Sequence, residues 1–447
     1  MKFFNKMKVR TRIAPSPTGL LHIGTARTAL FNYLFAKKHG GQFLIRIEDT
    51  DEARNTRESY DAITDGLSWL GMESDEKIEY QSKRGELYKE KIEELLEKGI
   101  AYYSFISEEE ISKRKEVAIA QNTRYIHRYS PQDEIAVDGI TPVVRLKIQA
   151  GVNVIIHDSV QGDVTINTDT IEDFVLARSD SSPIYMFAVV CDDIDMEITH
   201  VIRGVDHLTN TAKQILVYNA LNAQLPTFAH IPLIHGDDGS KLSKRHGAIS
   251  TMEYKTQGYL PEAIRAYLLR LGWGSGNDNI LNDEQALKEF SLEGIGRSPS
   301  RFDFAKLQSV NEFFIKNSTN EYLINTLKNN YNFNFDEILN PNETINLAKN
   351  RAKTLLELID VIQYFKKDFT KPQNLEQDKL EHIQNFLKNA KNENLHDEFK
   401  IFLDENGLKF KDIGQTFRMA LIGQTSSIGI FDIISIIGIE EAKKRIF

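Results

Sequence analysis

Residues 12–25 constrain the fold of this chain more than any other stretch. The stretch begins as a strand, because Val9, Thr11 and Ile13 alternate with two arginines, which is the period of a half-buried strand. Two prolines then end sheet pairing, since proline has no N–H to donate. A turn follows and leads into a helix, predicted over residues 25–39. This arrangement places the free N–H groups of a helix N-terminus, and its positive dipole end, where a phosphate can bind.

The remaining segments predict a chain of the α/β class with a helical C-terminal part. Strands are predicted at residues 43–47, 143–148, 184–190, 198–202 and 228–234, and helices at 60–70, 87–95, 108–121 and 209–221. Residues 101–183, with short strands after one helix, look like an insertion between two halves of a sheet. From about residue 313 to residue 447 the pattern is helical throughout.

Acidic residues follow two of the predicted strands. Asp49 and Asp51 come after the strand at 43–47, where they either cap the next helix or face a ligand at the carboxyl end of the sheet. The second group, Asp192-Asp193-Ile194-Asp195, could suggest a metal site. We instead interpret it as a loop that ends the strand at 184–190 and solvates its own charges.

Composition limits the class of protein. A chain of 447 residues has room for two to four domains. Its single cysteine, Cys191, excludes an internal disulfide and a multi-cysteine metal site, and it fits a reducing cytosol. We expect no membrane span, and residues 1–8 are too short and polar for a secretory signal. The net charge of −9 argues against a generally basic surface but permits local patches that bind nucleic acid.

Two motifs, with a third between them, carry a resemblance to a known family. Residues 17–25 read Pro-Thr-Gly-Leu-Leu-His-Ile-Gly-Thr, and residues 241–245 read Lys-Leu-Ser-Lys-Arg. They resemble the two motifs of class I aminoacyl-tRNA synthetases. Residues 12–19 together with Arg46-Ile-Glu-Asp-Thr-Asp51 resemble bacterial glutamyl-tRNA synthetases in particular. The likeness is clear from about residue 9 to 304 and becomes a general helical likeness afterwards.

The resemblance implies a fold and a division into domains. It implies a Rossmann-type catalytic domain at residues 8–100 and 184–238, which is interrupted by a tRNA acceptor-binding domain at 101–183. A stem-contact domain at 239–312 would carry the Lys-Leu-Ser-Lys-Arg loop. Residues 313–447 would form an all-helical anticodon-binding region.

The resemblance also implies the reaction, its substrates and its residues. The enzyme would activate L-glutamate with ATP and Mg²⁺, and would transfer it to the 3′ end of tRNA(Glu), tRNA(Gln) or both. We expect a cytoplasmic monomer. The expected catalytic residues are His22, Lys241 and Lys244, and the expected ATP-binding residues are His22, Gly24, Asp206 and Lys244. Glutamate carries two carboxylates and one ammonium, so its pocket needs about two cations and one anion. The expected set is Arg12, Ser16, Glu48, Tyr185 and Arg203.

The chain departs from the family's pattern at several positions. Relatives that bind a structural zinc have cysteines where this chain has Ser104, Ile106 and Tyr129. Because thiolates are the usual structural zinc ligands, we expect no zinc, and we interpret His127 as a surface or packed histidine rather than a lone ligand. Valine at position 205, where the family usually has an acidic residue, removes one polar contact from the nucleotide site.

Other interpretations differ in testable ways. Arg12 and Arg203 could simply pair with neighbouring aspartates. A glutaminyl enzyme would carry a neutral residue at position 203, and a truncated relative that glutamylates a modified tRNA base would lack the helical tail. An inactive tRNA-binding paralogue would not need His22, Lys241 and Lys244. For the choice between tRNAs, Arg351 falls where discriminating relatives carry an arginine that reads the last anticodon base, although an arginine on a helix can also be merely solvated.

Overall fold

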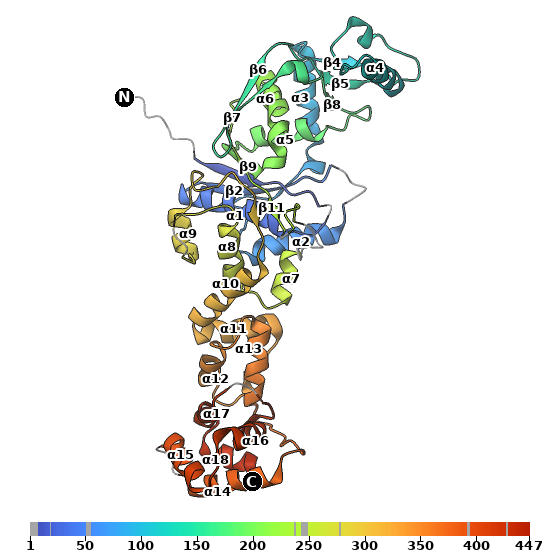
Figure 1. Cartoon of the computed structure of the whole chain (residues 1–447). Helices are drawn as coiled ribbons and strands as arrows, with labels where there is room; N and C mark the ends of the chain where they lie inside the picture. The colour runs from blue at the N-terminus through green and yellow to red at the C-terminus, as the bar shows by residue number, and fades with distance from the viewer. Residues whose placement is uncertain are drawn as a thin grey trace, which may run out of the picture. The chain divides into compact units, whose positions relative to one another are not determined.

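The computed structural model describes residues 8–17, 19–50, 55–236, 238–242, 249–276, 279–390, 394–425 and 428–447. The chain forms two compact units (Figure 1). The first comprises Met1–Tyr254 and Ile264–Asp303, and the second comprises Lys255–Ala263 and Phe304–Phe447. None of the helices in the described part combines the length and apolar character that crossing a bilayer requires.

The first unit alternates strands and helices. Its strands are β1 (Arg10–Ile13), β2 (Gln42–Ile47), β3 (Glu79–Tyr80), β4 (Ala101–Ser104), β5 (Val143–Leu146), β6 (Asn153–Asp158), β7 (Gly162–Asn167), β8 (Val175–Ala177), β9 (His200–Gly204), β10 (Thr227–Ile231), β11 (Ile234–His235) and β12 (Ser300–Arg301). Its α-helices are α1 (Ile23–Lys38), α2 (Arg57–Trp69), α3 (Gly85–Glu97), α4 (Glu108–Ala120), α5 (Tyr185–Asp195), α6 (Leu208–Ala220) and α9 (Asp283–Glu289). Short 3₁₀ turns are η2 (Gln81–Lys83), η3 (Pro131–Glu134), η4 (Thr168–Thr170) and η5 (Val205–His207). Helices α7 (Thr251–Thr256) and α8 (Pro261–Arg270) have residues in both units.

Two sheet halves meet between β1 and β9, one of them parallel and the other mixed, since β7 is antiparallel to β6. The strands β1, β2 and β3 form one three-stranded parallel sheet. The order β7-β6-β10-β9 forms the other, in which β10 is parallel to both β6 and β9. The two halves join where the Thr199 N–H donates to the Arg10 carbonyl at 3.0 Å. Ligands of open α/β sheets bind outside the carboxyl ends of strands at such a change of order.

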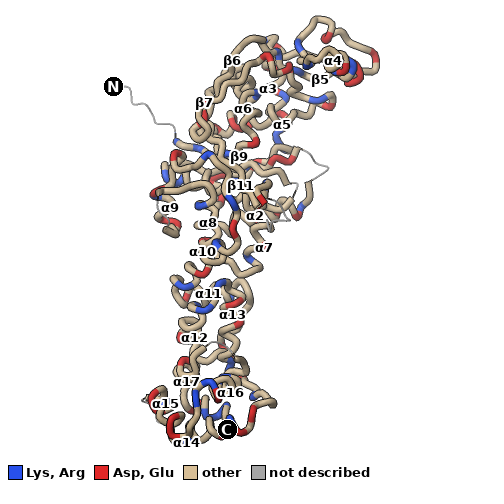
Figure 2. Tube along the Cα trace, in the orientation of Figure 1, with Lys and Arg blue, Asp and Glu red and all other residues tan. Residues whose placement is uncertain are grey.

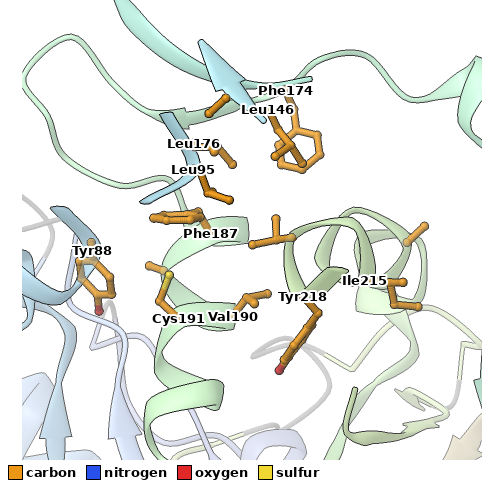
Figure 3. Close-up of a cluster of buried hydrophobic side chains, with 14 of the residues drawn as sticks. Tyr88, Leu95, Leu146, Phe174, Leu176, Phe187, Val190, Cys191, Ile215 and Tyr218 are labelled. Carbon is orange, nitrogen blue, oxygen red and sulfur yellow. The ribbon is translucent and has the colours of Figure 1, made fainter. Parts of the chain in front are cut away.

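The predicted strand at residues 184–190 is wrong. This segment is the start of α5, and residues Phe187–Asp193 are buried on every side of the helix. Figure 3 shows Phe187, Val190 and Cys191 packed in a buried cluster with residues of α3 and α6. A short run of apolar residues is typical of a buried strand and of a buried helix alike, so periodicity could not separate the two.

The predicted acidic loop is wrong for the same reason. Asp192 and Asp193 lie on α5, and both side chains are buried. Asp192 accepts from Gln81 Nε2 and from Arg84 Nε, each at 2.7 Å, so its charge is balanced by the protein rather than by water. Asp195 is the exposed member, and it also pairs with Arg84.

Asp49 does not cap the helix that follows it. Thr56 caps α2 by accepting from the Ser59 N–H at 3.2 Å. Asp49 instead accepts from the Ser82 N–H at 2.7 Å and from the Tyr60 hydroxyl at 3.0 Å. It therefore ties the end of β2 to η2. Asp51 lies outside the described residues.

The second unit is helical, as predicted. Its elements are α10 (Phe304–Asn317), α11 (Asn320–Tyr331), η7 (Phe335–Glu337), α12 (Pro341–Ala348), α13 (Leu355–Ile362), η8 (Gln363–Phe365), α14 (Gln377–Asn389), α15 (Leu395–Glu405), α16 (Phe410–Ile422), α17 (Ile430–Ile437) and α18 (Ile439–Ile446). Lys and Arg positions occur together with Asp and Glu positions along these helices (Figure 2). The basic positions are therefore local groups and do not cover the unit.

Candidate active site

The first predicted motif forms a capped helix start. His22 is the N-cap of α1, and its Nδ1 accepts from the Gly24 N–H at 3.1 Å and the Thr25 N–H at 3.3 Å. A Cβ on Gly24 would lie 3.1 Å from the imidazole, so glycine gives the ring its room. The two N–H groups predicted to be free are therefore occupied, and a phosphate that uses them must first displace the imidazole.

The second motif returns to the first. A turn at Gly236 and Gly239 lets the backbone of Lys241 form an antiparallel β-bridge with His235. Further along, the backbone of Ser250 forms an antiparallel β-bridge with His22. The Lys241 ammonium lies 3.1 Å from the Asp206 carboxylate. Desolvation and the nearby Lys241 charge lower the pKa of His22. The structure thus brings His22, Asp206 and Lys241 together, whereas Lys244 lies outside the described residues.

Arg12 forms a buried ion pair with Asp193. Its Nε and Nη2 donate to the two carboxylate oxygens of Asp193, at 3.0 and 3.2 Å. Arg46 donates to the same carboxylate at 2.6 Å and to Glu48 at 3.1 Å. Burial would raise the pKa of Asp193, but the two guanidinium groups hold it below its ordinary value. Arg12 therefore does pair with an aspartate, as the alternative interpretation expected.

Arg203 is held differently. Its Nε donates to His230 Nε2 at 3.1 Å, and its Nη2 donates to Thr211 Oγ1 at 2.7 Å and Gln214 Oε1 at 2.6 Å. In the described part of the chain no carboxylate pairs with it. Burial lowers its pKa, which reflects the cost of a charge without a counter-ion. The alternative interpretation is therefore wrong for this arginine.

Three other predicted residues, Tyr185, Glu48 and Ser16, come from separate elements. The charge of Arg12 acts on both Tyr185 and Glu48. Tyr185 is the first residue of α5, and its hydroxyl lies 3.2 Å from His207 Nδ1. Burial, and to a lesser extent the charge of Glu48, raise the pKa of Tyr185 to about 12. Burial also raises the pKa of Glu48. Ser16 is exposed in the loop after β1, and the Glu48 N–H fixes that loop by donating to the Pro15 carbonyl at 3.0 Å.

Comparison with known proteins decides the family. The family described as "tRNA synthetases class I (E and Q), catalytic domain" matches residues 8–309, and "Anticodon binding domain" matches residues 306–447. The chain belongs to the class I tRNA synthetases of the E and Q type.

Relatives of this synthetase match along its whole length. "Glutamate--tRNA ligase 1" of Rickettsia canadensis (strain McKiel) is 44% identical, over 98% of this chain and 99% of the relative. "Glutamate--tRNA ligase 2" of Wolbachia pipientis subsp. Culex pipiens is 45% identical, over 98% of both chains. A crystal structure of a glutamate tRNA ligase from Elizabethkingia meningosepticum in complex with its amino acid superposes with a TM-score of 0.84, at 28% identity and 98% coverage of both chains.

In this synthetase the sequence did not reveal the groups that hold the arginines. Asp193 and Arg46 lie 147 residues apart, and His230 and Asp158 lie 72 residues apart. A buried histidine inside the apolar strand β10 was a signal, because histidine is uncommon at a fully enclosed position.

His127, expected to be either a surface or a packed histidine, is a packed one. It is buried and lies 2.9 Å from the Tyr125 hydroxyl and 3.1 Å from the Tyr102 hydroxyl. Burial, and secondarily the charge of Arg145, lower its pKa to about 4. No cluster of three or more His, Cys, Asp or Glu residues suited to a metal ion occurs among the residues that the structure describes.

Arg351 lies in the second unit, in the turn after α12 rather than on a helix. Its Nη2 lies 3.7 Å from the Asp432 carboxylate, and its side chain is partly exposed. The guanidinium is thus only loosely held.

Proposed function

We propose that this chain activates L-glutamate with ATP and transfers it to tRNA in two steps. In the first step the α-carboxylate attacks the α-phosphorus of ATP and gives glutamyl-adenylate and pyrophosphate. In the second, the terminal ribose hydroxyl of tRNA attacks the activated carbonyl and releases AMP. The observation that carries the proposal is a buried arginine, Arg203, that has no carboxylate partner among the described residues, in a chain whose full-length relatives are named glutamate--tRNA ligases.

The amino acid pocket has the charges that glutamate needs. The Nη1 nitrogens of Arg12 and Arg203 donate to no group in the described part of the chain. Each guanidinium can therefore donate to a substrate carboxylate. Glu48 would receive the α-ammonium, and Tyr185 and Ser16 would add hydrogen bonds. A buried charge without a partner is costly, so binding of an anion at Arg203 relieves that cost.

The nucleotide would bind where the two motifs meet. His22 and Gly24 would face the phosphates and ribose, Asp206 would orient the nucleotide, and Lys241 and Lys244 would neutralise the leaving pyrophosphate. This chemistry depends on positioning and charge stabilisation and requires no covalent nucleophile. Mg²⁺ would arrive with ATP, because magnesium at such sites is held mainly by phosphates and water.

Three segments of the chain would bind tRNA. Residues 101–183 would hold the acceptor end, residues 239–312 would contact the stem, and residues 313–447 would read the anticodon. We further propose that the enzyme acts as a monomer in the cytoplasm, which the single buried cysteine fits.

Arg351 is our candidate for reading the last anticodon base, which is C in tRNA(Glu) and G in tRNA(Gln). Its weak contact with Asp432 leaves it able to turn toward RNA. If so, the enzyme prefers tRNA(Glu), and Arg351→Gln raises tRNA(Gln) charging relative to tRNA(Glu) by about ten- to a hundredfold. An unchanged ratio with pure transcripts would remove Arg351 from the recognition set.

Two related kinds of enzyme would behave differently from the one proposed. A glutaminyl enzyme would have to place a neutral amide against Arg203, which leaves a buried cation uncompensated, so glutamine should be a poor substrate.

A zinc-dependent relative would lose metal and activity on chelation. We propose that this enzyme carries no zinc, and elemental analysis that found about one zinc per chain would contradict this.

The direct test is ATP–pyrophosphate exchange with glutamate in the presence of tRNA. Wild-type protein should exchange, and Lys244→Ala should lower the rate by on the order of 100-fold, since it removes a charge contact made in the transition state. Lys89→Ala, on the exposed face of α3, serves as the matched control. Exchange that is absent in the wild type would overturn the proposed function, and near-normal exchange in Lys244→Ala would remove that lysine from it.

A further inference from the structure

Three buried side chains, linked by hydrogen bonds, connect the inserted hairpin to the proposed glutamate site. Asp158 is the last residue of β6, His230 lies on the neighbouring β10, and Arg203 lies on β9 beyond it. Asp158 Oδ2 lies 2.6 Å from His230 Nδ1, and His230 Nε2 lies 3.1 Å from Arg203 Nε. All three side chains are buried, and the imidazole is fully enclosed.

The partners of His230 fix its protonation. Arg203 Nε always carries a hydrogen, so His230 Nε2 must accept, and the ring proton must sit on Nδ1 and donate to Asp158. The Thr211 hydroxyl also lies 3.1 Å from Nε2 and can donate to it. The imidazole is therefore neutral. Burial lowers the pKa of His230, which agrees with this assignment.

The orientation of Arg203 follows from this tautomer. His230 accepts from Nε, while Thr211 and Gln214 accept the two hydrogens of Nη2. These three neutral acceptors hold the plane of the guanidinium and leave Nη1 as its unused edge. Because none of them carries a negative charge, they orient the cation without neutralising it.

We propose that His230 and Asp158 are positioning residues for glutamate binding, which hold Arg203 so that Nη1 faces the substrate carboxylate. This inference rests on the proposed function and adds a specific role for the inserted segment. Asp158 belongs to residues 101–183, so the hairpin β6–β7 supports the amino acid site as well as any tRNA contact. An imidazole in the other tautomer would turn an N–H toward Arg203 and disturb its orientation.

A pair of isosteric variants separates positioning from packing. In His230→Gln the side-chain carbonyl can take the place of Nε2 and accept from Arg203, while the bond to Asp158 is lost. In His230→Asn the amide can still donate to Asp158, but nothing reaches Arg203. If the histidine only fills space, the two variants should resemble each other. If it positions Arg203, only the asparagine variant should lose glutamate binding.

Asp158→Asn tests the tautomer. Asp158 Oδ1 accepts from the Val160 and Gln161 N–H groups at 2.9 and 2.8 Å, so an asparagine must keep its oxygen there. Its NH₂ then faces His230 Nδ1 and also the His230 backbone N–H, which keeps its bond to Oδ1 at 3.2 Å. The NH₂ donates to Nδ1, so the ring proton moves to Nε2, opposite Arg203 Nε–H. Two donors would face each other, and the guanidinium would move.

The experiment is aminoacylation of tRNA(Glu) with glutamate, with separate KM values for glutamate and ATP and with melting temperatures. His230→Asn and Asp158→Asn should each raise the KM for glutamate by about tenfold or more, because a hydrogen bond to a charged group is lost. Their KM for ATP should change by less than about threefold. His230→Gln should stay within about threefold of wild type in both constants. His200→Asn on β9, a histidine that contacts Thr199 and Phe35, is the matched control.

The outcomes are decisive in both directions. Equal KM values for glutamate in the Asn and Gln variants, or equal rises for glutamate and ATP, would overturn the positioning role. If His230→Asn does not fold, the comparison of Asp158→Asn with His230→Gln gives the same test. Wild-type charging is measured first. If it is absent the proposed function fails, whereas charging by the wild type with unaffected variants overturns only this inference.

Discussion

Two regions of the same site each hold a buried arginine, and they do so by opposite means. On the β1–β2 side, Arg12 shares the Asp193 carboxylate with Arg46, so its charge is largely balanced within the protein. On the β9–β10 side, the groups that hold Arg203 among the described residues are an imidazole, a hydroxyl and an amide. Both cations are oriented, but only the first is neutralised.

The difference teaches how a site can be rigid and still require its ligand. In a balanced ion pair the two charges compensate each other. Removal of one partner leaves the other charge buried and uncompensated, which destabilises the fold. A cation held by neutral acceptors keeps that cost until an anion arrives. We therefore expect the β1–β2 side to dominate stability and the β9–β10 side to dominate selection of a carboxylate substrate.

The largest effect should come from Asp193→Ala. The substitution leaves Arg12 without a carboxylate and weakens the balance around Arg46, so the free energy of unfolding should fall by about 3–5 kcal/mol. Asp195→Ala on the same helix is the control, because its carboxylate is exposed and should contribute less than about 1 kcal/mol. Urea unfolding measures both, and equal losses would remove the distinction between the buried pair and the exposed one.

A smaller difference in unfolding free energy should separate Arg12→Met from Arg203→Met. Arg12→Met leaves Asp193 with one cation fewer, whereas Arg203→Met removes an unbalanced charge and leaves neutral acceptors unpaired. Without ligand, Arg203→Met should therefore lie within about 1 kcal/mol of wild type, and Arg12→Met should be less stable by roughly 2 kcal/mol more. The reverse order in thermal or urea unfolding would mean that Arg203 has a counter-ion after all.

The smallest effect concerns pH. Burial lowers the pKa of His230, so the folded protein keeps it neutral at a pH where the unfolded chain, with a pKa near 6.5, is protonated. The unfolded state then binds more protons, and stability must fall as pH drops below about 6.5. At pH 5 this histidine lowers the free energy of unfolding by at most about 2 kcal/mol. His230→Gln should therefore lose less unfolding free energy between pH 7 and pH 5 than the wild type does. Asp193, whose pKa is lowered, keeps its contribution over this range. An unchanged pH dependence in the variant would show that His230 titrates normally.

Much of the fold could be predicted from local pattern. The helix predicted at 25–39 is α1 (Ile23–Lys38), and the helix predicted at 209–221 is α6 (Leu208–Ala220). The end of α1 was predictable because two lysines in its last turn are followed by Gly40, which has a positive φ. The segment 184–190 failed because it is enclosed on all sides. Its apolar character reports burial and carries no period, so only the tertiary structure decides between strand and helix.

The site was predictable in its residue types but not in its contacts. The resemblance grouped His22 with Lys241, and in the structure Lys241 pairs with Asp206 while the charges of both residues act on His22. The pairing of Arg12 with Asp193 joins residues 181 positions apart, and no local pattern encodes it. The same holds for the protonation of His230, which depends on partners from two other strands.

The most direct test is charging of pure tRNA(Glu) with labelled glutamate, and separately glutamine, by wild-type protein and by Arg203→Met. Wild type should charge glutamate and discriminate strongly against glutamine. Arg203→Met should lose glutamate charging by about 100-fold or more, since the substrate carboxylate loses its buried cation, while its unfolding free energy stays close to that of wild type. Glutamate charging by the folded variant at the wild-type rate would contradict the account, as would a wild-type enzyme that charges glutamine as readily as glutamate.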